Sequence, residues 1–471
     1  MSDTVEKLAQ FVVDTKYEDL PNDVVHATKY LLLDSIGCGL ASVTTDRGKM
    51  SIAMAKKMGG PPESSIIGVG DKVSNVSAAY VNGELINSTD YDSLIFPGGH
   101  VPPYVVPPTL AIAESKNVSG RDLLLATALG FEVAVRIPAG LMKNMFTGKG
   151  KEASFSWGKR GGQAYSNFGA SAGAAKLLSL DKERMAQALG ISGHLCQVLT
   201  HVRYSFSDNR PLTKYGVPGW QNTGGIMAAL LAEMGYMGDT TVFDGEYGFF
   251  NFCGYEGEVD LKTITRDIGK KWNFLRITYK PYPCCRMLHG GIDCLYKVIG
   301  ENNIKPEEIE SIEVMGHPTI ELPCFKHKEV ENVVDAQFNA AYVFSVVANG
   351  VSVGPEWQDY ATMHDPKIRK FMNKIKFRGH PDFVTKVQKD MSVQIYTVDV
   401  IARGKKFHEE TLHPSGTVGT EGAMSDGALE SKFRHNAARI LTQVKINSAM
   451  KALLNLEKVE KVSELMKEIT L

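Results

Sequence analysis

The spacing of apolar residues changes twice along the 471-residue chain, and this change most constrains its fold. Up to about residue 237, apolar side chains recur every three or four positions, which predicts a series of helices. After about residue 265, alternating and β-branched residues predict strands mixed with some helix. From Ser425 to the end, the pattern typical of charged amphipathic helices returns.

We therefore predict a mainly α fold, in which a large all-helical domain formed by both chain ends is interrupted by a smaller α+β lid domain. The predicted domain boundaries are residues 1–267, 268–415 and 416–471. The clearest predicted helices cover residues 24–41, 78–88, 123–137, 168–178 and 220–234. The clearest predicted strands cover residues 274–280, 309–315 and 391–401, and Arg403-Gly404-Lys405 is typical of a hairpin turn.

The charge balance and the cysteines limit the cellular setting and the partners. The chain has 52 Lys and Arg against 53 Asp and Glu, without the basic excess that non-specific nucleic-acid binding requires. The first residues are acidic where a secretory signal is basic, and the longest apolar stretch, residues 123–135, contains Glu132. Seven cysteines form no disulfide-like framework. We expect a cytoplasmic protein that binds neither nucleic acid nor membrane.

The usual cofactor and metal motifs are missing from the sequence. Neither Gly37-Cys-Gly39 nor Gly68-Val-Gly70 continues into the glycine spacing of a dinucleotide-binding turn. There is no His-Glu-x-x-His and no Cys-x-x-Cys, and the cysteines near residue 284 lack iron–sulfur spacing. We therefore predict a protein with no cofactor and no metal.

One candidate catalytic segment combines two carboxylates and a histidine. Asp90 and Asp92 follow a helix-like stretch, and Pro97-Gly98-Gly99 turns the chain back to His100. A carboxylate beside an imidazole tunes it across neutral pH, so such a pair can act as base and acid. A purely structural role, in which the aspartate ends a helix and the histidine is only hydrogen-bonded, is the alternative.

Two further segments are candidates for binding carboxylates. Lys280, Arg286 and His289 surround two prolines and a glycine-rich helix start, an arrangement suited to a carboxylate ligand. Two glycine-rich helix entries form the other candidate, and they carry Arg160, Gln163, Lys214 and Thr223. In the structural alternative for the first segment, the charged side chains are only solvated. In that for the second, the glycines only allow helices to cross closely.

Taken together, these segments resemble the MmgE/PrpD family, which includes 2-methylcitrate dehydratase, cis-aconitate decarboxylase and iminodisuccinate epimerase. The resemblance covers nearly the whole chain and rests on the order and spacing of several blocks. These are Leu33-Asp34-Ser-Ile-Gly37, Asp90-Tyr-Asp92 with His100, Phe168-Gly169, Ala188-Leu-Gly-Ile191, Thr213-Lys214 with Pro218-Gly219-Trp220, Lys280-Pro-Tyr-Pro-Cys with His289, Asp335-Ala-Gln-Phe-Asn, and Met424-Ser-Asp426 with Lys432-Phe-Arg434.

The resemblance implies a homodimer with a metal-free site between the two domains and a small carboxylic acid as substrate. It implies a lyase that moves a proton at a carbon next to a carboxylate, most simply by dehydrating a 2-methylcitrate-like acid. The predicted catalytic residues are Asp90, His100 and Lys280, and the predicted substrate-binding residues are Tyr91, Arg160, Gln163, Lys214, Thr223, Arg286 and His289. Which of Asp90 and His100 is the base stays open.

The chain departs from the family pattern at several polar positions. Leu94 stands where the family often has Thr, and Arg160 where it often has His. Val217 replaces a common His, and Thr223 stands where some members carry Lys or Arg. Since hydrogen-bonding groups discriminate strongly between substrates, these changes keep other reactions open. The alternatives are an epimerase or isomerase, a decarboxylase, and a non-catalytic carboxylate-binding protein.

Overall fold

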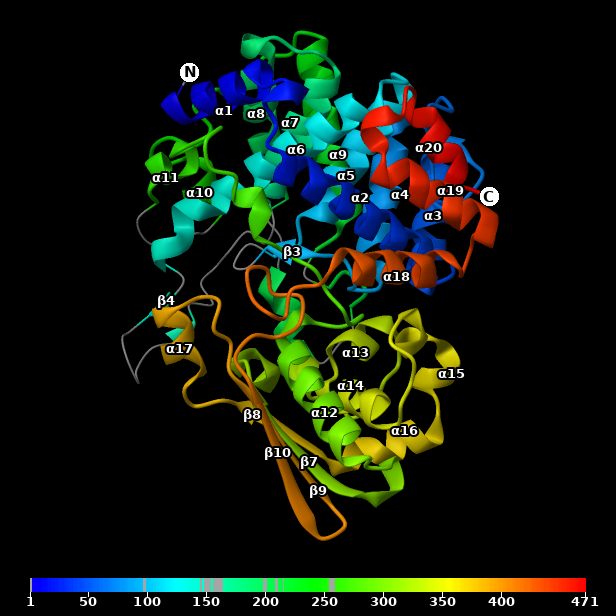
Figure 1. The fold of residues 1–471 in the computed structure, drawn as a ribbon. Helices are drawn as coiled ribbons and strands as arrows, with labels where there is room; N and C mark the ends of the chain where they lie inside the picture. Colours follow the sequence, from blue (N-terminus) through cyan, green and yellow to red (C-terminus); the bar gives the residue numbers. More distant parts are fainter. Residues whose placement is uncertain are drawn as a thin grey trace.

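The computed structural model describes residues 2–95, 99–144, 146–147, 154–155, 164–197, 201–207, 211–214, 216–253 and 259–471. Its larger part is a bundle of helices to which both chain ends contribute (Figure 1). The helices of this part are α1 (Asp3–Asp14), α2 (Asn22–Ser42), α3 (Asp46–Met58), α4 (Asn75–Ser88), α5 (Pro102–Ser115), α6 (Gly120–Arg136), α7 (Ser166–Leu177), α8 (Lys182–Leu195), α9 (Pro218–Glu233), α10 (Phe249–Phe252), α11 (Leu261–Thr265), α18 (Asp426–Ala437), α19 (Gln443–Leu454) and α20 (Val462–Glu468). Short strands also occur: β1 (Ser64–Ser65) pairs with β2 (Lys72–Val73), and β4 (Phe146–Thr147) pairs with β5 (Ser154–Phe155).

Side chains cap the starts of α6 and α8. Ser119 and Asp122 form a capping box at the start of α6, since each side chain binds the backbone N–H of the other. At the start of α8, the Asp181 carboxylate accepts from the backbone N–H of Arg184. All five helices predicted in the first half of the chain are present as α2, α4, α6, α7 and α9.

The smaller part contains a four-stranded sheet with helices beside it. It comprises α12 (His289–Asn302), β7 (Ile309–Gly316), α13 (Val333–Phe338), α14 (Ala340–Ala348), α15 (Tyr360–Met363), α16 (Pro366–Phe371), β8 (Ile375–Gly379), α17 (Phe383–Lys389), β9 (Tyr396–Ala402) and β10 (Lys405–Thr411). The strand order is β10-β9-β7-β8, with β7 and β8 parallel and the other pairs antiparallel. The predicted hairpin turn is confirmed, because Arg403 and Gly404 both adopt left-handed conformations between β9 and β10.

Two predicted strands are shorter in the structure than the sequence suggests. Residues 273–276 form a short 3-10 helix, and only β6 (Ile277–Thr278) is a strand. The backbone N–H groups of Asn273 and Phe274 donate to the buried Glu132 carboxylate, so a side chain takes the place of a neighbouring strand. Residues 391–395 precede β9 in a turn in which Ser392 binds the Asp390 carboxylate.

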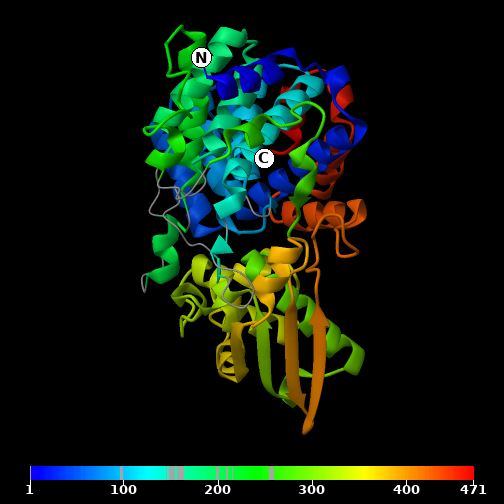
Figure 2. The same cartoon turned by 90° about the vertical axis from the view of Figure 1, so that its left-hand side faces the viewer.

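The buried apolar residues divide into two clusters. The larger cluster combines residues between 5 and 277 with residues between 429 and 469. The smaller one is formed by residues between 284 and 402. The two bodies meet near β3 (Leu94–Ile95) and α18, as the two orthogonal views show (Figure 2). The fold is thus mainly α, and both chain ends belong to the larger core.

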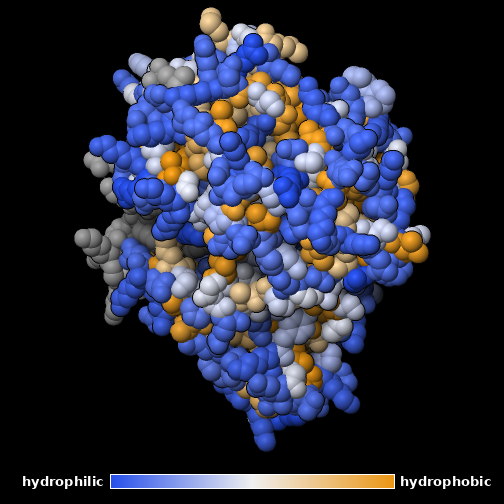
Figure 3. Space-filling view, turned by 45° about the horizontal axis from the view of Figure 1, so that its top comes forward, coloured by the Kyte–Doolittle hydropathy of each residue, from blue (hydrophilic) through white to orange (hydrophobic). Residues whose placement is uncertain are grey.

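The surface and the longest apolar helix fit this division. In the view of Figure 3, hydrophobic side chains gather over the helical part, whereas the narrow end with the β9–β10 hairpin is mostly hydrophilic. Among the described residues, one helical segment, residues 120–141, is long and apolar enough to cross a membrane, and 89% of its apolar window is buried inside the protein. It is a central helix of the larger core.

Candidate active site

The Asp90 carboxylate lies where the chain leaves α4, and it is 1% exposed. Its backbone adopts the left-handed conformation, with φ of 54°, two residues after the helix ends at Ser88. An aspartate tolerates this conformation better than most residues, but it is still uncommon and is typical of functional sites. The conformation turns Asp90 away from the helix and into a group of buried cations.

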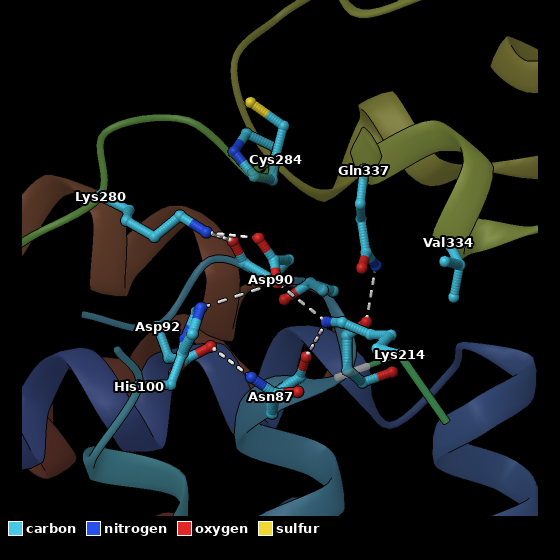
Figure 4. A network of polar contacts seen from close by, with 12 residues as sticks. Asn87, Asp90, Asp92, His100, Lys214, Lys280, Cys284, Val334 and Gln337 are labelled. Carbon is cyan, nitrogen blue, oxygen red and sulfur yellow. Dashed lines mark hydrogen bonds and ion pairs between the residues drawn. The ribbon is translucent and has the colours of Figure 1, made fainter. Parts of the chain in front are cut away.

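Two lysines contact the Asp90 carboxylate on opposite oxygens. Lys280 Nζ lies 2.5 Å from Oδ2 and also donates to the Asp90 carbonyl oxygen, and Lys214 Nζ lies 3.0 Å from Oδ1. Both lysine side chains are fully buried. Figure 4 shows the two ammonium groups converging on Asp90 from different segments of the chain. The sequence-predicted residues Asp90, Lys214 and Lys280 are therefore brought together.

Burial and charge act in opposite directions on the pKa values of this group. Burial alone would raise the pKa of Asp90, but Lys214 and Lys280 hold it well below its usual range. Burial lowers the pKa of Lys214 to about 8, although the charge of Asp90 works against this. For Lys280, the charges of Asp90 and Asp92 outweigh burial and raise the pKa. Asp90 is therefore ionised, Lys280 is firmly protonated, and Lys214 titrates near neutral pH.

A histidine–carboxylate pair lies beside Asp90. His100 Nδ1 lies 2.7 Å from Asp92 Oδ2, and the other Asp92 oxygen accepts from Asn87 at 3.1 Å. Since a carboxylate accepts, Nδ1 carries the proton and the other ring nitrogen, Nε2, faces Asp90 Oδ1 at 3.8 Å. All three side chains are buried. The predicted juxtaposition of Asp90 and His100 is present in the structure, and Asp92 fixes the imidazole.

Short strand pairings bring these segments together. β3 pairs with β6 in the register Leu94 with Thr278 and Ile95 with Ile277, which places the Asp90 segment beside the strand that leads to Lys280. Ile95 also pairs with Gly99, so the chain returns directly to His100. After Lys280 the chain bends at residues 281–284, where the Cys284 N–H donates to the Tyr282 carbonyl at 3.0 Å, and then enters the short helix Arg286–Leu288.

A third lysine, which the sequence did not single out for the site, supports the cluster from the C-terminal end of the chain. Lys432 of α18 donates to Asp34 Oδ1 at 2.7 Å and to the carbonyl oxygens of Tyr91 and Lys280 at 2.7 and 2.9 Å. Its ammonium also lies 3.8 Å from the centre of the Tyr91 ring. The signal in the sequence was Asp34, a charged residue in the apolar α2, which needs a buried partner.

Arg286 and His289 form a separate cluster. The Arg286 guanidinium donates to the carbonyl oxygens of Ser415 and Pro414 and to the Thr417 hydroxyl. It also donates to His289 Nδ1 at 3.1 Å, while the other nitrogen of His289 binds the Cys284 carbonyl at 3.3 Å. Burial and the neighbouring Arg286 charge hold the pKa of His289 well below its usual range. These contacts connect the start of α12 to the 414–417 loop.

The other predicted substrate-binding residues have different surroundings. Tyr91 is buried next to Asp90, and its hydroxyl donates to the Pro281 carbonyl at 3.0 Å. Thr223 lies in α9 and donates to the Gly219 carbonyl of the same helix at 3.0 Å. Arg160 and Gln163 lie outside the described residues.

In the part of the chain that the structure describes, no group of three or more His, Cys, Asp or Glu side chains is placed to hold a metal ion. The seven cysteines are free thiols.

Comparisons with known proteins identify the family to which the chain belongs. The model of the MmgE/PrpD N-terminal domain matches residues 6–262, and that of the MmgE/PrpD C-terminal domain matches residues 282–456. The human cis-aconitate decarboxylase is 25% identical over 480 residues, covering 98% of this chain and 93% of that protein. The cis-aconitate decarboxylase of Aspergillus terreus is 26% identical over 313 residues, or 64% of this chain and 61% of its own. A cis-aconitate decarboxylase-like protein of Aspergillus oryzae is 26% identical over 358 residues, which cover 72% of this chain and 71% of that protein. The chain therefore belongs to the MmgE/PrpD family.

Proposed function

We propose that this protein is a metal-independent lyase that acts on a small di- or tricarboxylic acid by proton transfer at a carbon next to a carboxylate. The observation that carries the proposal is the buried Asp90 carboxylate held between Lys214 and Lys280, with His100 beside it. A carbon next to a carboxylate is a very weak acid, so its reaction needs cations where negative charge develops and a placed group that moves the proton. The site offers both.

In this proposal His100 moves the proton. Asp92 holds the Nδ1 proton, which leaves Nε2 to exchange a proton with the substrate. Asp90 is a poor proton acceptor while both lysines hold its pKa low. We assign to it the placement of the two ammonium groups, which stabilise the negative charge that develops on the substrate carboxylate.

Two lyase reactions fit these roles. We rank decarboxylation of a cis-aconitate-like acid first, because the relatives described above carry that activity in their names and the human protein aligns with nearly the whole chain. Dehydration of a 2-methylcitrate-like hydroxy acid is second, since His100 is placed to protonate a leaving hydroxyl. Because polar groups of a site discriminate between substrates, the departures from the family pattern at Leu94 and Thr223 make the exact acid the point that the following experiment decides.

The test uses EDTA-treated protein in deuterated water with cis-aconitate, 2-methylcitrate, citrate and iminodisuccinate, followed by proton NMR. Loss of a carboxyl group identifies a decarboxylase and a new alkene identifies a dehydratase, and either supports the proposal. Deuterium uptake without net conversion identifies an epimerase or isomerase. Saturable binding without exchange of any substrate proton identifies a carboxylate-binding protein and overturns the proposal, as does activity that EDTA abolishes and a divalent metal restores.

We also propose a cytoplasmic homodimer. Its support is a set of exposed apolar side chains at helical spacing, Met50, Met54 and Met58 on α3 and Trp220 and Met227 on α9. Rows of this kind are typical of surfaces that a partner covers. Light scattering of the purified protein should give twice the mass of the chain, and Met54→Lys combined with Met227→Lys should give the monomer. Cell fractionation tests the location.

A further inference from the structure

The backbone that presents Asp90 is held by side chains at five consecutive positions. The carbonyl oxygens of residues 87 to 91 accept, in order, from Lys214, Gln337, Gln358, Lys280 and Lys432. All five residues of this segment are buried. Carbonyl groups at a helix end lack partners within the helix and need them elsewhere when water is excluded. Here each carbonyl oxygen has a side-chain partner from a distant part of the sequence, and the Asn87 carbonyl also accepts from the backbone N–H of Asp90.

Two of the five donors come from the smaller core. Gln337 lies on α13 and donates to the Ser88 carbonyl at 2.7 Å, while Gln358, in the short helix Pro355–Gln358, donates to the Thr89 carbonyl at 2.6 Å. Figure 4 shows Gln337 reaching from its helix toward the Asp90 cluster. The Asp90 segment itself belongs to the chain of the larger core. These two amides therefore bridge the two bodies of the protein directly beside Asp90.

The orientation of both amides is fixed by their partners. Gln358 Nε2 donates to two carbonyl oxygens, those of Thr89 and Pro283, so its other atom, Oε1, must be the acceptor. Gln337 Nε2 donates to that Oε1 at 2.8 Å as well as to Ser88. A rotated amide at either position would place two acceptors or two donors together. Each amide is thus held in one orientation, in which its N–H groups donate to the backbone next to Asp90.

We propose that Gln337 and Gln358 are positioning residues that hold Asp90 in its reactive place when the smaller core is docked on the larger one. The proposal rests on the proposed function and adds to it two residues that position Asp90 without contacting its carboxylate. Asp90 sits in an uncommon left-handed conformation, so loss of the two preceding anchors allows the segment to relax. Its carboxylate would then move relative to the two ammonium groups.

The variants Gln337→Met and Gln358→Met test this, since methionine keeps the length of the side chain and removes the donor. A displacement of about 1 Å can lower turnover by about 100-fold, so we expect kcat to fall by about 10- to 100-fold with KM within about twofold. Hydrogen exchange of a peptide that spans residues 87–95 should become faster in both variants. The fall of the kcat/KM profile above about pH 8, which we assign to Lys214, should shift in both.

Gln394→Met is the matched control, because Gln394 is another buried glutamine of the smaller body and donates to none of the five carbonyl groups. It should keep kcat, the pH profile and the exchange of residues 87–95 within about twofold of wild type, even if it lowers the melting temperature as much as the test variants do.

Three results distinguish the possible failures. Wild-type kcat and unchanged exchange in Gln337→Met and Gln358→Met would overturn the positioning role. Equal loss in Gln394→Met would also overturn it, because the loss would then reflect general destabilisation. If the wild-type protein turns over no acid, the proposed function fails, and the exchange experiment still decides whether the two glutamines hold the segment.

Discussion

Lys280 and Arg286 lie six residues apart, both are buried, and both looked equally suited to a substrate carboxylate, yet the structure surrounds them differently. Lys280 contacts the Asp90 carboxylate, in a group that includes Lys214 and His100. Arg286 is surrounded by carbonyl oxygens, a hydroxyl and a neutral histidine. A buried cation that binds main-chain oxygens fixes the fold of a loop, whereas a carboxylate shared by several cations creates a charged group that a substrate can perturb. The two clusters differ less in the type of their cationic residue than in the groups that this residue contacts.

The largest expected effect comes from removing the charge at the centre of the first cluster. Asp90→Asn keeps the shape but leaves two buried ammonium groups without their counter-charge. We expect kcat/KM to fall by about 1,000-fold, within the range of groups that take part in proton transfer and charge placement. Circular dichroism should show an intact fold. Turnover near that of wild type would mean that Asp90 takes no part in the chemistry. The Lys280 cluster would then differ from the Arg286 cluster in charge alone and not in function.

A smaller effect is expected for Lys280→Met. This variant removes one ammonium and the donor to the Asp90 carbonyl, while Lys214 still contacts the carboxylate. Loss of one group that stabilises developing charge costs about 100- to 1,000-fold in kcat. Steady-state kinetics should show the loss in kcat, with Lys280→Arg recovering part of it. A loss confined to KM would mean that Lys280 binds the substrate equally well before and during the reaction.

The pH dependence should report on the other lysine. The pKa of Lys214 is lowered to about 8, so its ammonium is present below this pH and is lost as the pH rises through 8. The pKa of Lys280 is raised above its usual value, so Lys280 keeps its charge over this range. We expect kcat/KM to be level below about pH 7.5 and to fall about tenfold per pH unit above about 8.5. In Lys214→Arg the fall should disappear, and a fall that persists there would assign it to another group.

Much of the fold could be predicted because it depends on local signals. The three- and four-residue spacing, the capping box at Ser119 and the turn at Arg403-Gly404 act within a few residues. The strand predicted from residue 274 failed at its start because Glu132, 142 positions earlier in the chain, supplies the hydrogen-bond partner. No local pattern contains that information.

The residues of the candidate site also fall into those that a local pattern predicts and those that depend on distant partners. Asp90 and His100 stand out because they are titratable residues only ten positions apart, with a Pro-Gly-Gly turn between them. Gln337 lies in the Asp335-Ala-Gln-Phe-Asn block, but neither it nor Gln358 carries a charge that would point to the site. Asp34 was a usable signal that pointed to an unknown partner, which the structure identifies as Lys432. Residues whose roles come from long-range hydrogen bonds are those that sequence reasoning misses.

A moderate effect should follow from Asp92→Asn. The amide can donate to His100 Nδ1 and so favour the wrong tautomer, which leaves Nε2 protonated when it should accept. We expect kcat to fall by about 10- to 100-fold with little change in stability, and His100→Asn added to it should cause little further loss. Independent losses of the two variants would show that the histidine and the carboxylate do not act as a pair.

The smallest effect on activity is expected in the second cluster, where Arg286→Met gives the sharpest test of the comparison. The variant removes the donors to the 414–417 loop, so unsatisfied buried oxygens should lower the free energy of unfolding by about 1–3 kcal/mol. Because the hydrogen bonds of Arg286 go to His289 and the 414–417 loop, kcat at a temperature where the variant is fully folded should stay within about threefold of wild type. Thermal unfolding and kinetics measured on the same preparation separate the two quantities. A rise of KM by 10-fold or more with unchanged stability would instead show that Arg286 binds the substrate carboxylate, as its place in the sequence predicts, and would join the two clusters into one site.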